Sequence, residues 1–110
     1  MDKKLLKEIN LLHAQICGGL ADPKRIAILY ALADGAASVN ELAEALEMPQ
    51  ATLSRHLKVL RDRGIVVATR QGMNIFYSLA DKRILQALDL LRQVLAKDLS
   101  KRSALAEALS

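Results

Sequence analysis

The fold of this chain is decided by the stretch Gln50-Ala-Thr-Leu-Ser-Arg-His-Leu-Lys-Val-Leu-Arg-Asp-Arg-Gly64. Leu53, Leu57 and Leu60 recur at the i, i+4, i+7 spacing of a core-facing stripe, which predicts an amphipathic helix. The opposite side of this helix carries Ala51, Ser54, Arg55, Lys58 and Asp62. Small and hydroxyl side chains let a helix approach base edges, and cations one turn further along suit phosphates or guanines. An ordinary surface helix has the same pattern, so the flanking segments must decide between the two interpretations.

A second helix is predicted directly upstream. Ser38 and Glu41 have the spacing of a capping box, in which each side chain accepts a hydrogen bond from the other residue's backbone N–H. This helix should end before Pro49, because proline disfavours helical geometry in the residue before it. Pro49 can then precede the first turn of the next helix, where its missing N–H costs nothing. Two short helices joined by a tight turn predict a helix-turn-helix.

A β-hairpin is predicted downstream. Gly64 can end the helix in the left-handed conformation, and two runs rich in β-branched and aromatic residues follow at 65–69 and 75–79. The loop between them contains glycine and asparagine, as hairpin loops often do. A hairpin after a recognition helix is the wing of a winged helix-turn-helix, and its tip carries polar side chains that can reach DNA. These side chains are Arg70, Gln71 and Asn74.

Four segments in order along the chain form a further pattern. They are Leu20-Ala-Asp-Pro-Lys-Arg-Ile-Ala-Ile-Leu29, Leu53-Ser-Arg-His-Leu-Lys-Val-Leu60, Gly64-Ile-Val66 and Arg70-Gln-Gly followed by Tyr77-Ser-Leu79. This pattern resembles the arsenic-repressor (ArsR/SmtB) family of bacterial regulators, from about Leu12 to about Leu95. The resemblance implies about five helices plus the wing, and a homodimer formed by the first and last helices. It also implies a repressor that leaves its operator when an effector binds.

Three features depart from the family pattern. Pro49 and Ala51 stand where serines are frequent, which removes two possible hydroxyl contacts with DNA. Met73 occupies the wing tip, where a cation is common. The third departure concerns the sensing sites: the helix after Ser38 has no cysteine, and the last helix has no histidine. Neither metal site of the family can therefore be carried over, and a dithiol sensor would need a second cysteine.

The resulting prediction is a single, mainly α domain over residues 1–110, with a small β-hairpin. The helix-turn-helix spans about 38–63, the wing about 65–79, and the dimerisation helices about 3–19 and 81–97. The predicted DNA-binding residues are Gln50, Ala51, Thr52, Ser54, Arg55, Lys58, Arg70, Gln71 and Asn74. The expected partner is a palindromic double-stranded DNA operator.

The distribution of charge supports this interpretation. The chain has a net charge of +4, and residues 50–74 alone hold five cations against the single carboxylate of Asp62. Those cations are Arg55, Lys58, Arg61, Arg63 and Arg70. The preceding helix is acidic, so positive charge is concentrated toward the proposed DNA face.

The end helices carry more apolar surface than one small domain can bury. We predict that the dimer interface includes Leu5, Ile9, Leu12 and Ile16 of the first helix and Leu88, Leu91 and Leu95 of the last. A second apolar face on terminal helices is typical of a two-fold dimer. Such a dimer would place two recognition helices about 34 Å apart, one turn of DNA.

The single histidine–cysteine pair leaves two interpretations open. His13 and Cys17 have i, i+4 spacing in the first helix, so a dimer could supply four ligands to a soft metal ion. Alternatively, Cys17 is a small buried hydrophobic residue and His13 ends the apolar stripe. No cofactor is predicted. His56 beside the leucine stripe is interpreted as a packing or hydrogen-bonding residue.

Other classes of function fit less well. No paired carboxylates, nucleophile–base motif or phosphate loop is present, so an enzyme is not expected. A winged helix that only binds proteins remains an alternative, but it should expose apolar side chains on the second helix. Charges interrupt the N-terminal residues before any apolar run of useful length, so no secretory signal is expected, and no apolar stretch is long enough to span a membrane. We therefore expect a cytoplasmic regulator without a membrane partner.

Overall fold

Helices form most of the structure, which is a computed structural model of residues 1–110. The elements are α1 (Lys3–Leu12), η1 (His13–Cys17), α2 (Pro23–Ala31), β1 (Ala37–Ser38), α3 (Val39–Leu46), α4 (Gln50–Asp62), β2 (Val66–Gln71), β3 (Asn74–Leu79) and α5 (Arg83–Leu109). η1 is a π-helical turn that continues α1, and we call α1 and η1 together the first helix. Counted in this way, the five predicted helices and the winged helix-turn-helix are confirmed.

The core lies between α2, α3, α4 and the base of the sheet. The stripe predicted on α4 is fully buried, with Leu53, Leu57 and Leu60 all at 0% exposure. Its neighbours in the core are Ile28, Leu29, Leu32, Leu42, Ile65, Val66, Tyr77 and Leu88. Burying a leucine side chain stabilises a fold by about 1.5–3 kcal/mol, so this stripe fixes which side of α4 faces solvent.

The predicted helix caps are present. Asp22 accepts a hydrogen bond from the Lys24 backbone N–H at 2.8 Å, with Pro23 in the first turn of α2. Ser38 and Glu41 form the complete capping box of α3, with both hydrogen bonds at 3.2 Å. α3 ends at Glu47, whose φ of 50° is left-handed. That turn redirects the chain through Pro49 into α4, as the helix-turn-helix requires.

The wing has a shorter turn and one more strand than the sequence indicates. β2 and β3 pair as far as Gln71 and Asn74, so the connection is only Gly72-Met73, and Gly72 supplies the positive φ of 63° that such a turn needs. A third strand, β1, pairs with β3 through Ala37 opposite Tyr77. The sequence prediction missed β1, because two residues are too few to show an alternating pattern.

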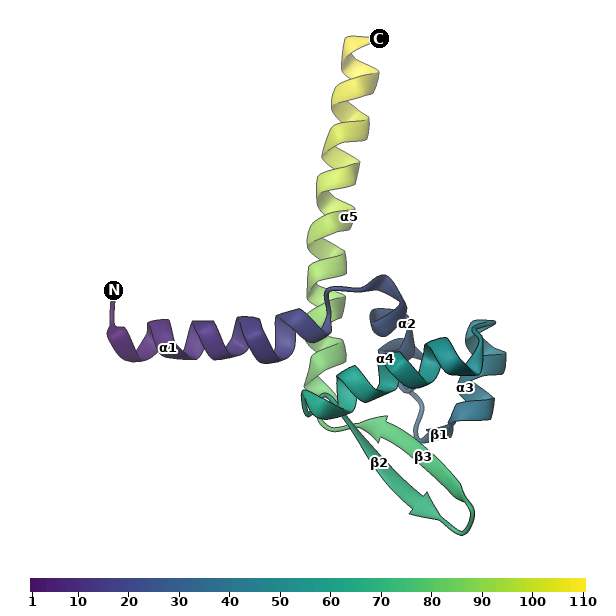
Figure 1. The fold of residues 1–110 in the computed structure, drawn as a ribbon. Coiled ribbons are helices and arrows are strands. Elements are labelled where there is room, and N and C mark those ends of the chain that lie inside the picture. Colours follow the sequence, from purple (N-terminus) through teal and green to yellow (C-terminus); the bar gives the residue numbers. More distant parts are fainter.

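The two terminal helices project away from the rest of the molecule in different directions (Figure 1). No residue of α1 is buried, and Leu88 is the only buried residue of α5. α5 continues past the expected boundary near residue 97 as far as Leu109, so the charged tail extends the helix. None of the helices combines the length and the apolar composition needed to cross a lipid bilayer.

Candidate nucleic-acid interface

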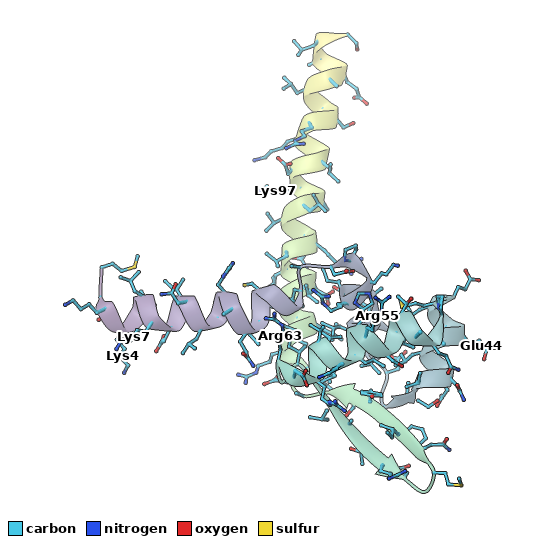
Figure 2. The ribbon with its side chains drawn as sticks, viewed as in Figure 1. Lys4, Lys7, Glu44, Arg55, Arg63 and Lys97 are labelled. Atoms are coloured by element: carbon cyan, nitrogen blue, oxygen red, sulfur yellow. The ribbon has the colours of Figure 1, made fainter.

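The solvent-facing side of α4 carries the side chains predicted to bind DNA. Gln50, Ala51, Ser54, Arg55 and Lys58 are all exposed, and Thr52 is half-buried. Ala51, Ser54, Arg55 and Lys58 lie opposite the buried stripe and form the outer face of the helix, whereas Gln50 is exposed in its first turn; Figure 2 shows Arg55 on α4. Arg55 makes no ion pair or side-chain hydrogen bond within the protomer, so its guanidinium is free for a phosphate or a guanine.

A contact between the two helices of the motif orients the start of this face. The Gln50 side-chain amide donates a hydrogen bond to the side-chain oxygen of Asn40 on α3. One N–H and the oxygen of the Gln50 amide remain available, and this is the pair that reads adenine in the major groove. Sequence reasoning missed Asn40, since it lies inside the capping box and has no pattern of its own.

Lys58, unlike Arg55, forms an ion pair within the protomer. Its ammonium lies 2.8 Å from a carboxylate oxygen of Asp62, one turn further along α4. The hydrogen bond from Lys58 lowers the pKa of Asp62, so the carboxylate is ionised at neutral pH. DNA phosphates must therefore compete with Asp62 for this cation.

The wing carries a second group of exposed polar side chains. Arg70 and Gln71 end β2, and Asn74 begins β3, all three exposed. Met73 at the tip is 95% exposed and offers no charge to DNA. The hairpin extends away from α5 and lies beside α4, which contacts β2 (Figure 1).

The structure corrects one part of the charge argument. Arg63 does not belong to the DNA face, because its guanidinium donates to the backbone oxygens of Ala14 and, at 3.4 Å, Gln15. Figure 2 shows Arg63 where α4 meets the first helix, apart from Arg55. The cations that can bind DNA are therefore fewer than the five counted in the sequence.

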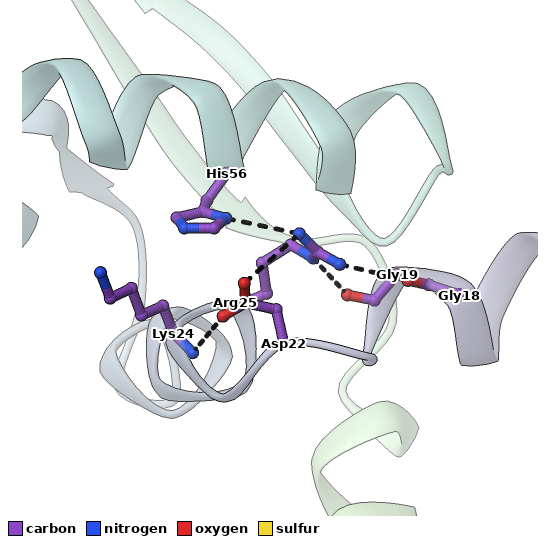
Figure 3. A network of polar contacts seen from close by, with 6 residues as sticks. All are labelled: Gly18, Gly19, Asp22, Lys24, Arg25 and His56. Carbon is purple, nitrogen blue, oxygen red and sulfur yellow. Dashed lines mark hydrogen bonds and ion pairs between the residues drawn. The ribbon is translucent and has the colours of Figure 1, made fainter.

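His56 joins a polar network on the inner side of α4 (Figure 3). Its Nδ1 lies 3.4 Å from Arg25 Nη1, and it must be the acceptor, because a guanidinium can only donate. Arg25 also donates to the backbone oxygens of Gly19 at 2.8 Å and Gly18 at 3.3 Å. This placement agrees with the hydrogen-bonding role expected of His56.

Most of the residues assigned to the dimer interface are open to solvent in the protomer. Leu5, Ile9, Leu12, Leu91 and Leu95 are exposed, and Ile16 is half-buried against the core. Leu88 is different: it is 6% exposed and packs in the core, so it is not part of an exposed face. The cause is its position on the side of α5 that faces Ile26 and Tyr30 of α2.

A groove also runs between the first helix and the start of α5. It has a volume of about 500 Å³, and its apolar lining includes Leu12, Ile16, Ile65 and Ile84. Leu12 of α1 and Ile84 and Ala87 of α5 lie on its two sides, so the groove lies between the two terminal helices.

α5 is held to α2 by a cluster that the sequence did not reveal. The Tyr30 hydroxyl donates to Asp89 at 2.6 Å, and Arg92 lies 3.3 Å from the same carboxylate. The Arg92 guanidinium is also 5.2 Å from the centre of the Tyr30 ring. The hydrogen bond to Asp89 raises the pKa of Tyr30 and keeps the hydroxyl protonated. These contacts fix where α5 leaves the domain.

Cys17 is exposed in the protomer, so it is not part of the core of the domain. It lies on the outside of η1, where the first helix has not yet reached the core, and His13 on the same turn is also exposed. No group of three or more His, Cys, Asp or Glu side chains that could hold a metal ion lies together in the protomer.

Known proteins show the same architecture. Residues 22–67 match the model of the arsR family of bacterial regulatory proteins. The chain is 40% identical to the HTH-type transcriptional regulator CmtR of Mycobacterium tuberculosis over 102 residues, which cover 87% of this chain and 86% of CmtR. A solution structure described as the cadmium metal-sensor CmtR of M. tuberculosis has 43% identity and a TM-score of 0.63, covering 74% of this chain and 85% of that one.

Two further solved structures are similar over most of their length. The crystal structure of M. tuberculosis Rv0081 has a TM-score of 0.73 and 34% identity, covering 93% of this chain and 98% of Rv0081. The homodimeric winged helix-turn-helix DNA-binding domain Mb0332 of Mycobacterium bovis has a TM-score of 0.76 and 27% identity, with coverage of 90% and 91%.

Proposed function

The chain belongs to the ArsR/SmtB family of winged helix-turn-helix transcriptional regulators, and from this premise we propose how it binds DNA, assembles and is regulated. As a member of this family it is a DNA-binding regulator of transcription. We propose that the exposed face of α4 and the wing bind DNA and that the terminal helices form the dimer.

The DNA contacts are assigned to α4 and the wing. The first turns of α4 enter the major groove, where Gln50, Ala51, Thr52 and Ser54 meet base edges. Arg55 and Lys58 bind phosphates or guanines one turn further along, and Arg70, Gln71 and Asn74 of the wing reach the adjacent backbone or groove. The observation that carries this assignment is the fully buried Leu53-Leu57-Leu60 stripe, which leaves only small and polar side chains on the outer face of α4.

The active form is proposed to be a homodimer through α1 and α5. The exposed leucines of both helices and the groove between them support this assembly, since a monomer would leave this apolar surface in water. Mb0332 is described as homodimeric, which is consistent with it. Two-fold symmetry presents two copies of α4 to DNA, so the operator should be palindromic.

The regulator is proposed to act in the cytoplasm as a repressor that an effector releases from DNA. In a second candidate function, that effector is a soft metal ion or thiol reagent at His13 and Cys17. Both side chains are exposed on η1, and two copies would supply four ligands. The description of the similar protein CmtR as a cadmium metal-sensor supports this second candidate function. A purely protein-binding role is disfavoured, because the outer face of α4 exposes no large apolar side chain.

Selection of binding sites from random DNA duplexes tests the proposed function directly. The wild-type protein should enrich an inverted repeat, because two symmetry-related copies of α4 read two half-sites. Failure to enrich any sequence would contradict the proposed DNA-binding face. Enrichment of a single half-site would contradict the proposed dimer.

A further inference from the structure

Two arginines, Arg25 of α2 and Arg63 at the end of α4, each donate to two backbone oxygens of the first helix. Arg63 donates to Ala14 and Gln15, and Arg25 donates to Gly18 and Gly19. These oxygens lie in the last turns of the first helix, which remains helical to Gly19. The last four carbonyls of a helix carry partial negative charge and favour cations, and Gly18 and Gly19 belong to this set, whereas Ala14 and Gln15 lie one turn earlier. Arg25 therefore caps the C-terminal end of the first helix, and Arg63 binds the same helix one turn before that end.

Gly18 and Gly19 make this close approach possible. A Cβ at Gly18 would lie 2.6 Å from Arg63 Nη1, and a Cβ at Gly19 would lie 2.5 Å from Ile65 Cδ1 and 3.1 Å from Arg63 Cδ. Any larger side chain at either position would have to displace the arginine or the isoleucine. The glycine pair thus has a packing role in addition to weakening the end of the helix.

The same network holds α4 at two points. Arg63 is the residue that ends α4, and His56 on α4 accepts from Arg25 (Figure 3). His56 and Arg63 are seven residues apart, so they lie on one side of α4 about two turns from each other. Two points of attachment fix the direction of a helix, whereas one would fix only its position. The Arg25 side chain is only 15% exposed, so this attachment is shielded from solvent.

We propose that Arg63 and Arg25 are positioning residues, which fix the orientation of α4 relative to the first helix and thereby set the spacing of the two recognition helices in the dimer. The inference rests on the proposed function, because it requires the first helix to pair across the dimer. Neither arginine needs to touch DNA. Arg63 would act by transmitting the geometry of the dimer interface to α4.

The test is the dependence of DNA affinity on half-site spacing. One base pair more or less between the half-sites rotates one of them by about 35° and shifts it by about 3.4 Å. Operators with the selected half-sites and spacers altered by one base pair are titrated by fluorescence anisotropy. The wild type should prefer its own spacing by roughly tenfold or more. Arg63→Ala should reduce this preference to about twofold, because α4 can then adjust to either spacing.

Arg61→Ala is the matched control, because this substitution removes the same charge. Arg61 is exposed and makes no side-chain hydrogen bond or ion pair. It should keep the wild-type preference for spacing even where its overall affinity changes. Arg63→Lys retains a donor for the carbonyls and should recover much of the preference. Circular dichroism and sedimentation confirm that each variant is folded and dimeric.

Gly18→Ala provides a second route that leaves the charge of Arg63 in place. Its Cβ displaces the guanidinium, so it should weaken the spacing preference as Arg63→Ala does. A folded, dimeric Arg63→Ala or Gly18→Ala protein that keeps the tenfold preference would overturn the inference while leaving the proposed function intact. A wild-type protein without any preferred spacing would instead overturn the proposed dimer and this inference with it.

Discussion

Lys58 and Asp62 form an ion pair along the outer face of α4, with Lys58 Nζ 2.8 Å from Asp62 Oδ2. Both side chains are more than half exposed, at 68% and 54%, and an exposed pair of this kind adds little to stability. The ion pair should therefore affect DNA binding more than it affects the stability of the fold. The carboxylate occupies a cation that phosphates would otherwise use, and it places a negative charge near the phosphate backbone.

Replacing Asp62 by asparagine should consequently strengthen DNA binding. Removing one carboxylate near a phosphate should raise the affinity roughly fivefold at moderate salt. Fluorescence anisotropy with the selected operator measures the change. Asp98→Asn is the matched control, because Asp98 forms a similar i, i+4 pair with Arg102 far along α5. An equal gain in both variants would attribute the effect to net charge alone.

Replacing Arg55 and Lys58 together by alanine should weaken operator binding by orders of magnitude. Loss of two phosphate contacts should also lower the slope of log affinity against log salt by about 1.8, at about 0.9 for each contact. Titrations between 50 and 200 mM salt give this slope directly. Lys97→Ala with Lys101→Ala removes the same charge from α5 and should leave the slope nearly unchanged. An unaltered slope in the Arg55/Lys58 variant would place the DNA face elsewhere.

Glutamate at Leu91 or Leu95 should dissociate the dimer while leaving the protomer folded. Each substitution buries a carboxylate twice across a two-fold interface, at a cost of several kcal/mol. Sedimentation velocity measures assembly and circular dichroism measures folding. Gln93→Glu adds the same charge to α5 and serves as the control. A Leu91→Glu protein that remains dimeric would contradict the assigned interface.

Leu88→Glu should behave differently from Leu91→Glu and Leu95→Glu, because Leu88 is in the core. It should lower the melting temperature or prevent folding, since it places an unpaired carboxylate among buried leucines. Loss of DNA binding in this variant would therefore report unfolding, whereas loss in Leu91→Glu reports dissociation.

The second candidate function predicts that Zn²⁺ or Cd²⁺ releases the wild-type protein from its operator and that Cys17→Ala or His13→Ala abolishes this release. Thiolate and imidazole are ligands that these ions prefer, whereas Mg²⁺ prefers oxygen and provides the control. Anisotropy during metal titration is the measurement. Metal-induced release that persists in Cys17→Ala would exclude this site, and a wild-type protein that stays on its operator would exclude these metals as effectors.

The local features of the fold could be predicted from sequence because their physical causes are local. The capping box of Ser38 and Glu41, the Asp22–Pro23 helix start and the glycine at residue 64 each depend on neighbours within a few residues. The buried stripe of α4 followed in the same way from helical periodicity. The wing was predicted by its two β-branched runs, although its turn is shorter than expected.

The features that could not be predicted depend on residues far apart in the chain. Arg63 binds backbone oxygens 48 and 49 positions away, and nothing in its local sequence distinguishes it from Arg61. Periodicity could not separate Leu88 from Leu91, because both lie on the apolar part of α5 and only the packing of the folded domain shows that Leu88 is the buried one. The exposure of Cys17 likewise depends on where the first helix leaves the core.

Selection of binding sites with the wild type and with a Gln50→Ala, Ser54→Ala variant tests the central claim most directly, namely that the outer face of α4 reads operator DNA in a two-fold dimer. We expect the wild type to enrich an inverted repeat whose half-site centres lie about 10 base pairs, or a multiple of this, apart. The variant should keep that symmetry and relax the preference at the base pairs read by Gln50 and Ser54. An identical consensus from both proteins, or enrichment without two-fold symmetry, would contradict the account.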